Sequence, residues 1–149
     1  IGGTSADMGN AVFVAAMLEL PTMAFFTKMS EKINCGTLIK FSILMFCVKH
    51  ALTYFATNMI MIYLAQVCQM FAYALFIPAS VYYVNKKIAV ADRVKGQSLV
   101  TTSMTLSGVF ANFAGGIMLD ALGVGHVLLA GVILSIVGAV IVILTTEKV

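Results

Sequence analysis

Long apolar runs alternate with short polar breaks along nearly the whole chain. The breaks read SEKINCG, TNM, KKIAVADRVKG and DALGVGH, and each contains charged, glycine or turn-forming residues. The runs between them are about 20 residues or longer, which is the length that a helix needs to cross the hydrocarbon core of a bilayer. The pattern therefore predicts five membrane-spanning helices, at residues 9–29, 37–56, 59–85, 97–119 and 124–145.

The composition fits a chain that lipid surrounds. Of its 149 residues, 61% are hydrophobic and 10% are charged, and the mean hydropathy is +1.03. Soluble domains are about a quarter charged, so we expect an all-α, polytopic membrane helix bundle that forms a single transmembrane domain over residues 1–149. The chain begins with Ile1 and has no basic segment before its first apolar run. We expect no cleavable signal peptide, and a fragment of a longer gene product.

The basic residues indicate an orientation in the membrane. Eight of the nine Lys and Arg residues fall at alternate ends of the expected helices, and hence on one side: Lys28, Lys32, Lys40, Lys86, Lys87, Arg93, Lys95 and Lys148. The opposite side carries no Lys or Arg and holds Asp7, Asn58, Asp120 and His126. Basic loops face the cytoplasm in most membrane proteins. The pattern therefore predicts a cell-membrane protein with its N-terminus outside and its C-terminus in the cytoplasm.

Several classes of function have no motif in this sequence. It contains no Ser/His/Asp or Cys/His arrangement, no metal-ligand spacing, no phosphate loop and no aromatic–basic pattern for nucleic acid. We therefore expect no enzymatic activity, no cofactor, no metal, no nucleic-acid partner and no ATP-driven motor. The three cysteines, an odd number without metal-ligand spacing, are expected to be small buried hydrophobes.

Four ionisable or strongly polar side chains lie deep in the expected helices: Glu19, Lys49, His50 and Asn112. Glu19 is about 15 Å from either end of its helix, and Lys49 is about 12 Å from the outer end of the next helix, at 1.5 Å per residue. These helices are consecutive and antiparallel, so we predict a Glu19–Lys49 pair, direct or through water. The alternatives are a protonated Glu19 that bonds to a backbone carbonyl, and a Lys49 that extends toward the interface.

The other two deep residues allow two interpretations each. His50 is either a hydrogen-bonded filler on an apolar face or a functional group. Asn112 shares a helix with a polar face made of Thr101, Thr102, Ser103, Thr105 and Ser107. That face either lines a water-filled cavity or forms hydrogen bonds between helices.

Both prolines of the chain, Pro21 and Pro78, fall inside expected spans. Proline frees a carbonyl one turn back and bends a helix, so we expect a kink at each. Tyrosine and serine side chains flank Pro78: Tyr73, Ser80, Tyr82 and Tyr83. Such a bent, hydroxyl-rich segment is typical of a substrate path, but helix bundles also use it structurally.

Small residues recur at every fourth position of the fourth expected helix: Ser103, Ser107, Ala111 and Gly115. Small side chains at this spacing let a second helix approach closely in lipid. We expect a helix-packing seam here; a functional alternative is that this helix slides or rocks against its neighbour.

Two stretches of the chain point to a family. TKMSEKINCGTLIK is a short basic loop, and DRVKGQSLVTTSMTLSGVFANFAGGIMLDALG contains a Gly-Gln start and a Gly-Gly, acidic residue and Gly end. The positions concerned are Gly96, Gln97, Gly115, Gly116, Asp120 and Gly123. Together they resemble the carboxy-terminal half of a major facilitator superfamily transporter. The resemblance covers essentially the whole chain. It implies that the five helices are the eighth to twelfth of twelve, in a partial six-helix half without the N-terminal half.

Within that superfamily the chain is most similar to the oligosaccharide and nucleoside proton-symporter group, which includes lactose permease. That group carries a glutamate in the eighth helix and a basic residue, usually arginine, in the ninth; here Glu19 and Lys49 stand at those places. The stretch QMFAYALFIP departs from lactose permease, because it lacks the charged and histidine cluster of the tenth helix. The proton site of lactose permease is therefore not carried over.

The resemblance implies part of a secondary active transporter that moves a small polar solute, such as a sugar or nucleoside, by alternating access and with coupling to protons. Its expected partners are the lipid bilayer, the solute, protons and the missing N-terminal half. Under the alternative hypothesis the chain is a truncated or accessory membrane protein without transport activity of its own.

Overall fold

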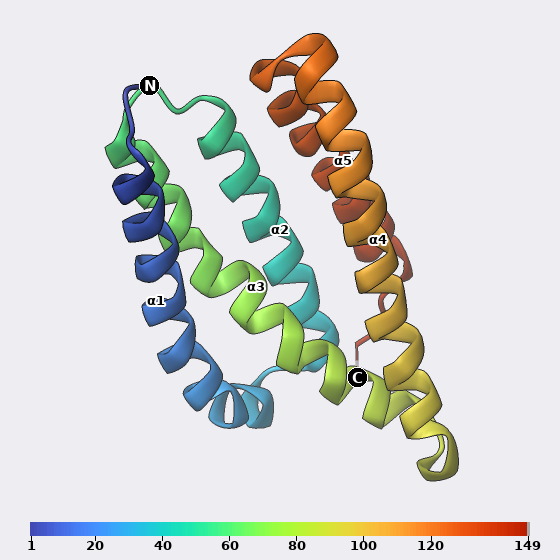
Figure 1. The fold of residues 1–149 in the computed structure, drawn as a ribbon. Coiled ribbons are helices and arrows are strands. Elements are labelled where there is room, and N and C mark those ends of the chain that lie inside the picture. Colours follow the sequence, from blue (N-terminus) through green and yellow to red (C-terminus); the bar gives the residue numbers. More distant parts are fainter. Residues whose placement is uncertain (149) are drawn as a thin grey trace.

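A computed structural model describes residues 1–148, which form five long helices and one 3-10 turn (Figure 1). The elements are α1 (Ser5–Lys32), α2 (Cys35–Tyr54), α3 (Met59–Lys87), η1 (Val90–Asp92), α4 (Arg93–Leu122) and α5 (Val124–Thr145). Each of the five long helices is long and apolar enough to cross a membrane. The predicted all-α bundle of five spanning helices is confirmed, and residues 1–148 contain no strand.

Helix capping makes the first helix begin earlier than its hydrophobic residues predict. α1 begins at Ser5, four residues before the expected start, because Thr4 and Asp7 form a capping box. The Asp7 amide donates to the Thr4 hydroxyl at 3.3 Å, and the Thr4 amide donates to the Asp7 carboxylate at 2.8 Å. α3 begins at the expected Met59, where the Asn58 side chain accepts from the amide of Met61 at 3.1 Å.

The helices do not pack in the order of the sequence. α3 packs against both α1 and α2, α5 packs against α2 and α4, and α1 and α2 make little contact with each other. Figure 1 shows α3 crossing between α1 and α2. The main apolar core lies where these three helices meet and is formed by Phe26, Leu38, Ile39, Leu75 and Ala79. The predicted Glu19–Lys49 pair requires the first two helices to pack together, but α3 contacts both and they make little contact with each other.

α4 is packed loosely by comparison. Gly96, near its start, is its one buried residue within the described part of the chain. A methyl group built on Gly96 would overlap the side chains of Ile88 and Val84, so α4 approaches the end of α3 closely at this point. Beyond Gly96, α4 lies beside α5 and contacts it in part (Figure 1), and large apolar side chains such as Phe110 and Phe113 are exposed.

All eight basic residues of the predicted cytoplasmic side lie at one end of the bundle, the lower end in Figure 1. We call it the basic end, and it comprises the C-terminal ends of α1 and α3, the N-terminal ends of α2 and α4, and the segment after α5. Lys49, the ninth basic residue, is half-buried and lies within α2.

At the basic end, the segment after α5 is tied to the rest of the bundle through Glu147. The Glu147 carboxylate forms an ion pair with Lys87, and the Glu147 amide donates to the Tyr83 hydroxyl at 3.3 Å. The hydrogen bond from Lys87 holds the pKa of Glu147 below its ordinary value. The carbonyl of Glu147 lies directly over Gly36, where there is no room for even a methyl group.

We therefore predict that Gly36→Ala displaces this segment and lowers the free energy of unfolding by about 1–3 kcal/mol, the usual cost of inserting a methyl group into a filled space. Gly138→Ala is the matched control, because a methyl group there meets nothing within 4 Å; alanine in a helix is also favoured over glycine by roughly 0.5–1 kcal/mol. Thermal unfolding in detergent measures both variants. Equal stability in Gly36→Ala and Gly138→Ala would contradict the contact.

Candidate functional site

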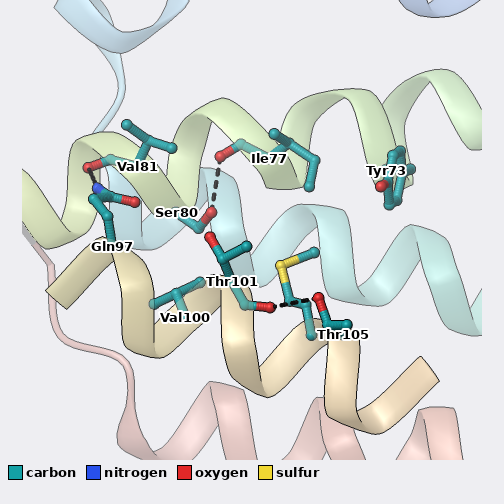
Figure 2. A pocket seen from close by; sticks show the side chains of 9 residues that line it. Tyr73, Ile77, Ser80, Val81, Gln97, Val100, Thr101 and Thr105 are labelled. Carbon is teal, nitrogen blue, oxygen red and sulfur yellow. Dashed lines mark hydrogen bonds between the residues drawn. The ribbon is translucent and has the colours of Figure 1, made fainter. Parts of the chain in front are cut away.

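A cavity of about 490 Å³ lies between α3 and α4 (Figure 2). Nine residues line it, and five of them are polar: Tyr73, Ser80, Gln97, Thr101 and Thr105. No Asp, Glu, Lys or Arg is among the nine. We call this space the hydroxyl groove, and it offers hydrogen-bonding groups without charge between two helices of the bundle.

Helical spacing explains why these residues share one wall. On α3, positions 73, 77, 80 and 81 recur every three to four residues, and on α4 positions 97, 100, 101, 104 and 105 do the same. Residues at this spacing lie on one face of a helix. The polar threonines of α4 therefore face the tyrosine and serine of α3, and Figure 2 shows Ser80 and Thr101 directed toward the space between the two helices.

Hydrogen bonds fix the basic end of this groove and leave its middle available. The Gln97 side-chain amide donates to the Val81 carbonyl at 2.9 Å and to Asn85 at 3.4 Å, which fastens α4 to α3. The Ser80 hydroxyl donates to the Ile77 carbonyl at 2.8 Å, within its own helix. The Tyr73 and Thr101 side-chain hydroxyls have no partner among residues 1–148. The groove can thus both donate hydrogen bonds to a bound molecule and accept them from it.

A second polar cluster lies deeper in the bundle and centres on Lys49. The Lys49 ammonium donates to the side-chain oxygen of Gln69 on α3. Neither of the two ion pairs in residues 1–148 involves Lys49 or Glu19. Glu19 is half-buried in the middle of α1, and its charge acts on Lys49 only over a longer range. The direct form of the predicted Glu19–Lys49 pair is absent, because α3 lies between the two helices and supplies Gln69 as the partner.

A search of the sequence for charged residues in the spans does not identify Gln69, because an amide carries no charge. It lies in QMFAYALFIP, the stretch that lacks acids and strong bases. A glutamine among apolar residues of a spanning helix indicates a polar contact, since its side chain must find a partner in a medium without water.

No three His, Cys, Asp or Glu side chains of residues 1–148 come together as metal ligands.

The remaining predicted residues neither line the hydroxyl groove nor form a hydrogen bond with the Lys49 or Gln69 side chain. The His50 ring is half-buried and stacks on Phe46 with ring centroids 6.3 Å apart, and its Nδ1 atom is shielded without a partner within the described residues. Asn112 is exposed on α4, two helical turns beyond Thr105. Pro21 is exposed in α1, whereas Pro78 is half-buried in α3 on the stretch that lines the hydroxyl groove.

The small-residue stripe of α4 faces no helix of this chain. Three of its four residues are exposed, and a methyl group built on the fourth, Gly115, meets nothing within 4 Å. The same holds for Gly108 and Gly116 beside it. Residues 1–148 therefore contain no partner for this stripe, and its role as a packing seam stays a prediction.

A family model described as Major Facilitator Superfamily matches residues 1–149, the whole chain. Searches of curated proteins and of solved structures each returned no match. Five consecutive apolar helices agree with the family match, since members of this superfamily are multi-pass proteins that carry small solutes across lipid membranes. The chain therefore belongs to the major facilitator superfamily of membrane transporters.

Proposed function

We propose that this chain is part of a secondary active transporter that moves a small, neutral, polar solute, such as a sugar or nucleoside, along the hydroxyl groove. The observation that carries the proposal is the groove itself, a cavity of about 490 Å³ with five uncharged polar side chains and no charged one. Hydroxyl and amide groups can satisfy the hydroxyls of such a solute without the desolvation cost that a buried charge adds.

We propose further that transport is coupled to protons and that Glu19 takes part. Carboxylates inside a membrane are costly and are kept mainly where they bind or exchange charge. Glu19 is half-buried and has no ion-pair partner among residues 1–148. A carboxylate without a fixed counter-charge can be protonated and deprotonated within a transport cycle. Lys49, which donates a hydrogen bond to Gln69, is the basic residue that we propose as a long-range counter-charge for Glu19.

The cycle we propose is alternating access, in which two six-helix halves rock around a site near the middle of the membrane. This chain holds five of those helices, so an N-terminal half and one further helix would complete the transporter. The exposed small-residue stripe of α4 supports this proposal, because it offers a close-packing surface that no helix of the chain uses. His50, Asn112 and the bends at Pro21 and Pro78 remain candidates for solute or proton handling.

Uptake tests the proposed function. Cells that express the full-length protein containing this chain would be given a labelled disaccharide or a labelled nucleoside, with and without a protonophore. We expect uptake of one of these solutes above that of cells without the protein, and loss of accumulation with the protonophore. Absence of uptake of both solutes, in protein shown to reach the membrane, would favour the alternative of a truncated or accessory membrane protein.

The proposed topology predicts a labelling pattern. In a background whose three native cysteines are replaced, a cysteine at Asn58 or Gly125 should react with an impermeant reagent added outside intact cells. A cysteine at Ala91 should react only after the cells are opened, because Ala91 lies at the basic end, which we place in the cytoplasm. All three sites are exposed, so their reactivity reports sidedness and not burial. Labelling of position 91 in intact cells would reverse the orientation.

A further inference from the structure

A second cavity lies at the basic end, where the end of α3 meets the start of α4. Its volume is about 480 Å³, and its polar lining consists of Asn85, Arg93, Gln97, Ser98, Thr101 and Thr102. It adjoins the hydroxyl groove and shares Gln97 and Thr101 with it. Unlike the groove, this cavity has a cation in its wall.

That cation, Arg93, has no counter-charge in the described chain. Its guanidinium makes no hydrogen bond within residues 1–148, and its Nε atom is shielded from solvent without a partner. The acids nearby are engaged elsewhere: Asp92 pairs with Lys95 at 2.8 Å, and Glu147 pairs with Lys87. An unsatisfied, shielded donor on a charged group is costly. The cost would be removed by an acceptor that enters the cavity.

The other polar residues that line this cavity can also donate hydrogen bonds to such an acceptor. Ser98 and Thr102 are one helical turn apart on α4, and neither hydroxyl has a hydrogen-bond partner among the described residues. Arg93, Ser98 and Thr102 all line the cavity, and no carboxylate lines it. Guanidinium groups bind phosphate through parallel hydrogen bonds, and neighbouring hydroxyls add further donors.

We propose that this cavity binds a phosphate group, with Arg93 as the charged ligand and Ser98 and Thr102 as hydroxyl donors. The phosphate could belong to a membrane lipid or be free in solution. A furrow of about 290 Å³ continues along α4 past Leu106 and Val109 and shares Thr101 and Thr102 with the cavity, so an acyl chain would have an apolar path to follow. The proposal does not depend on the identity of the transported solute.

Binding to the purified full chain in a neutral detergent tests the site, with native mass spectrometry as the readout. The probes are dioleoyl phosphatidylglycerol, dioleoylglycerol, which has the same acyl chains without phosphate, and inorganic phosphate. We expect phosphatidylglycerol to bind saturably and dioleoylglycerol not to bind. Binding of inorganic phosphate, and competition by it, would identify free phosphate as a sufficient ligand; its absence would assign the site to the lipid headgroup.

Arg93→Gln should weaken phosphatidylglycerol binding by about tenfold or more, as expected for loss of a hydrogen-bonded charge. Lys86→Gln is the matched control, because it removes the same charge from an exposed position at the same end of the bundle, and it should bind as the parent does. The double variant Ser98→Ala, Thr102→Val keeps every charge and should weaken binding severalfold. If Arg93→Gln unfolds, which circular dichroism would reveal as a loss of helix, the double variant still tests the site.

Three results would overturn the proposal. Equal weakening in Arg93→Gln and Lys86→Gln would show that only the overall charge of the basic end matters. Equal binding of dioleoylglycerol and phosphatidylglycerol would show that the furrow holds acyl chains without recognition of phosphate. Unchanged binding in the double variant, with Arg93 intact, would show that the cavity lined by Ser98 and Thr102 is not where the lipid binds.

Discussion

Replacing Gln69 by leucine is expected to lower the free energy of unfolding by about 2 kcal/mol, since a hydrogen bond to a charged group contributes roughly 1.5–3 kcal/mol. The Lys49 ammonium donates to the Gln69 side chain, and both residues are half-buried inside the bundle. Leucine has nearly the same size but no acceptor, so the variant leaves the charge of Lys49 without its partner. Thermal unfolding in detergent would measure the loss.

A double-mutant cycle separates this contact from a general effect of the substitution. Lys49→Met should also destabilise the chain, because it leaves the Gln69 amide unpaired. The variant with both changes should recover most of the loss, since no unpaired polar group remains. Gln66→Leu is the matched control, because Gln66 is half-buried one turn away on α3. Losses that simply add in the double variant would show that Lys49 and Gln69 do not interact.

The sequence was sufficient to predict the helices but not their neighbours. Runs of apolar residues define spanning helices because lipid requires every backbone group to be paired within the helix. Hydrophobicity does not locate the helix starts as well: it indicates position 9 for the first helix, whereas the capping box of Thr4 and Asp7 begins that helix at Ser5. Apolar periodicity carries little information here, since helices surrounded by lipid are apolar on every face.

Both polar sites depend on which helices pack against each other, and this is why the direct Glu19–Lys49 pair was predicted wrongly. Glu19 and Lys49 have similar depths, and depth follows from counting residues along a helix. Their direct pairing required α1 and α2 to be neighbours, but α3 packs between them. The hydroxyl groove likewise forms because α3 and α4 meet near the basic end, where Gln97 bonds to the Val81 carbonyl. The sequence marked the threonines of α4 as a polar face without indicating which helix they approach.

The exposed stripe of α4 shows the opposite case, in which the sequence indicates a contact that this chain cannot supply. Ser103, Ser107 and Ala111 have the spacing of a packing seam, yet no helix of residues 1–148 covers them. Ser107→Leu should therefore leave the stability of this chain unchanged. In our proposal the missing half of the transporter covers the stripe, so the same substitution should destabilise the full-length protein.

The largest effect on transport is expected from Glu19→Gln in the full-length protein, which should abolish accumulation of the solute against its gradient. Glutamine has the shape of the protonated acid but cannot release a proton, so a cycle that needs this carboxylate to titrate cannot be driven by a proton gradient. Stability should change little, because the side chain of Glu19 has no hydrogen-bond or ion-pair partner in the described residues. Uptake of the labelled solute, with and without an imposed pH gradient, measures the effect.

A second assay distinguishes the two roles that Glu19 can have. If the carboxylate only exchanges protons, Glu19→Gln should still exchange labelled for unlabelled solute across the membrane, since exchange needs no net proton movement. If the carboxylate binds solute hydroxyls, exchange should fail together with accumulation. Glu31→Gln is the matched control, because Glu31 is an exposed acid at the basic end of the same helix and should leave both assays unchanged. Full accumulation by Glu19→Gln would show that the carboxylate has no part in coupling, and the proton-linked cycle would then need another group.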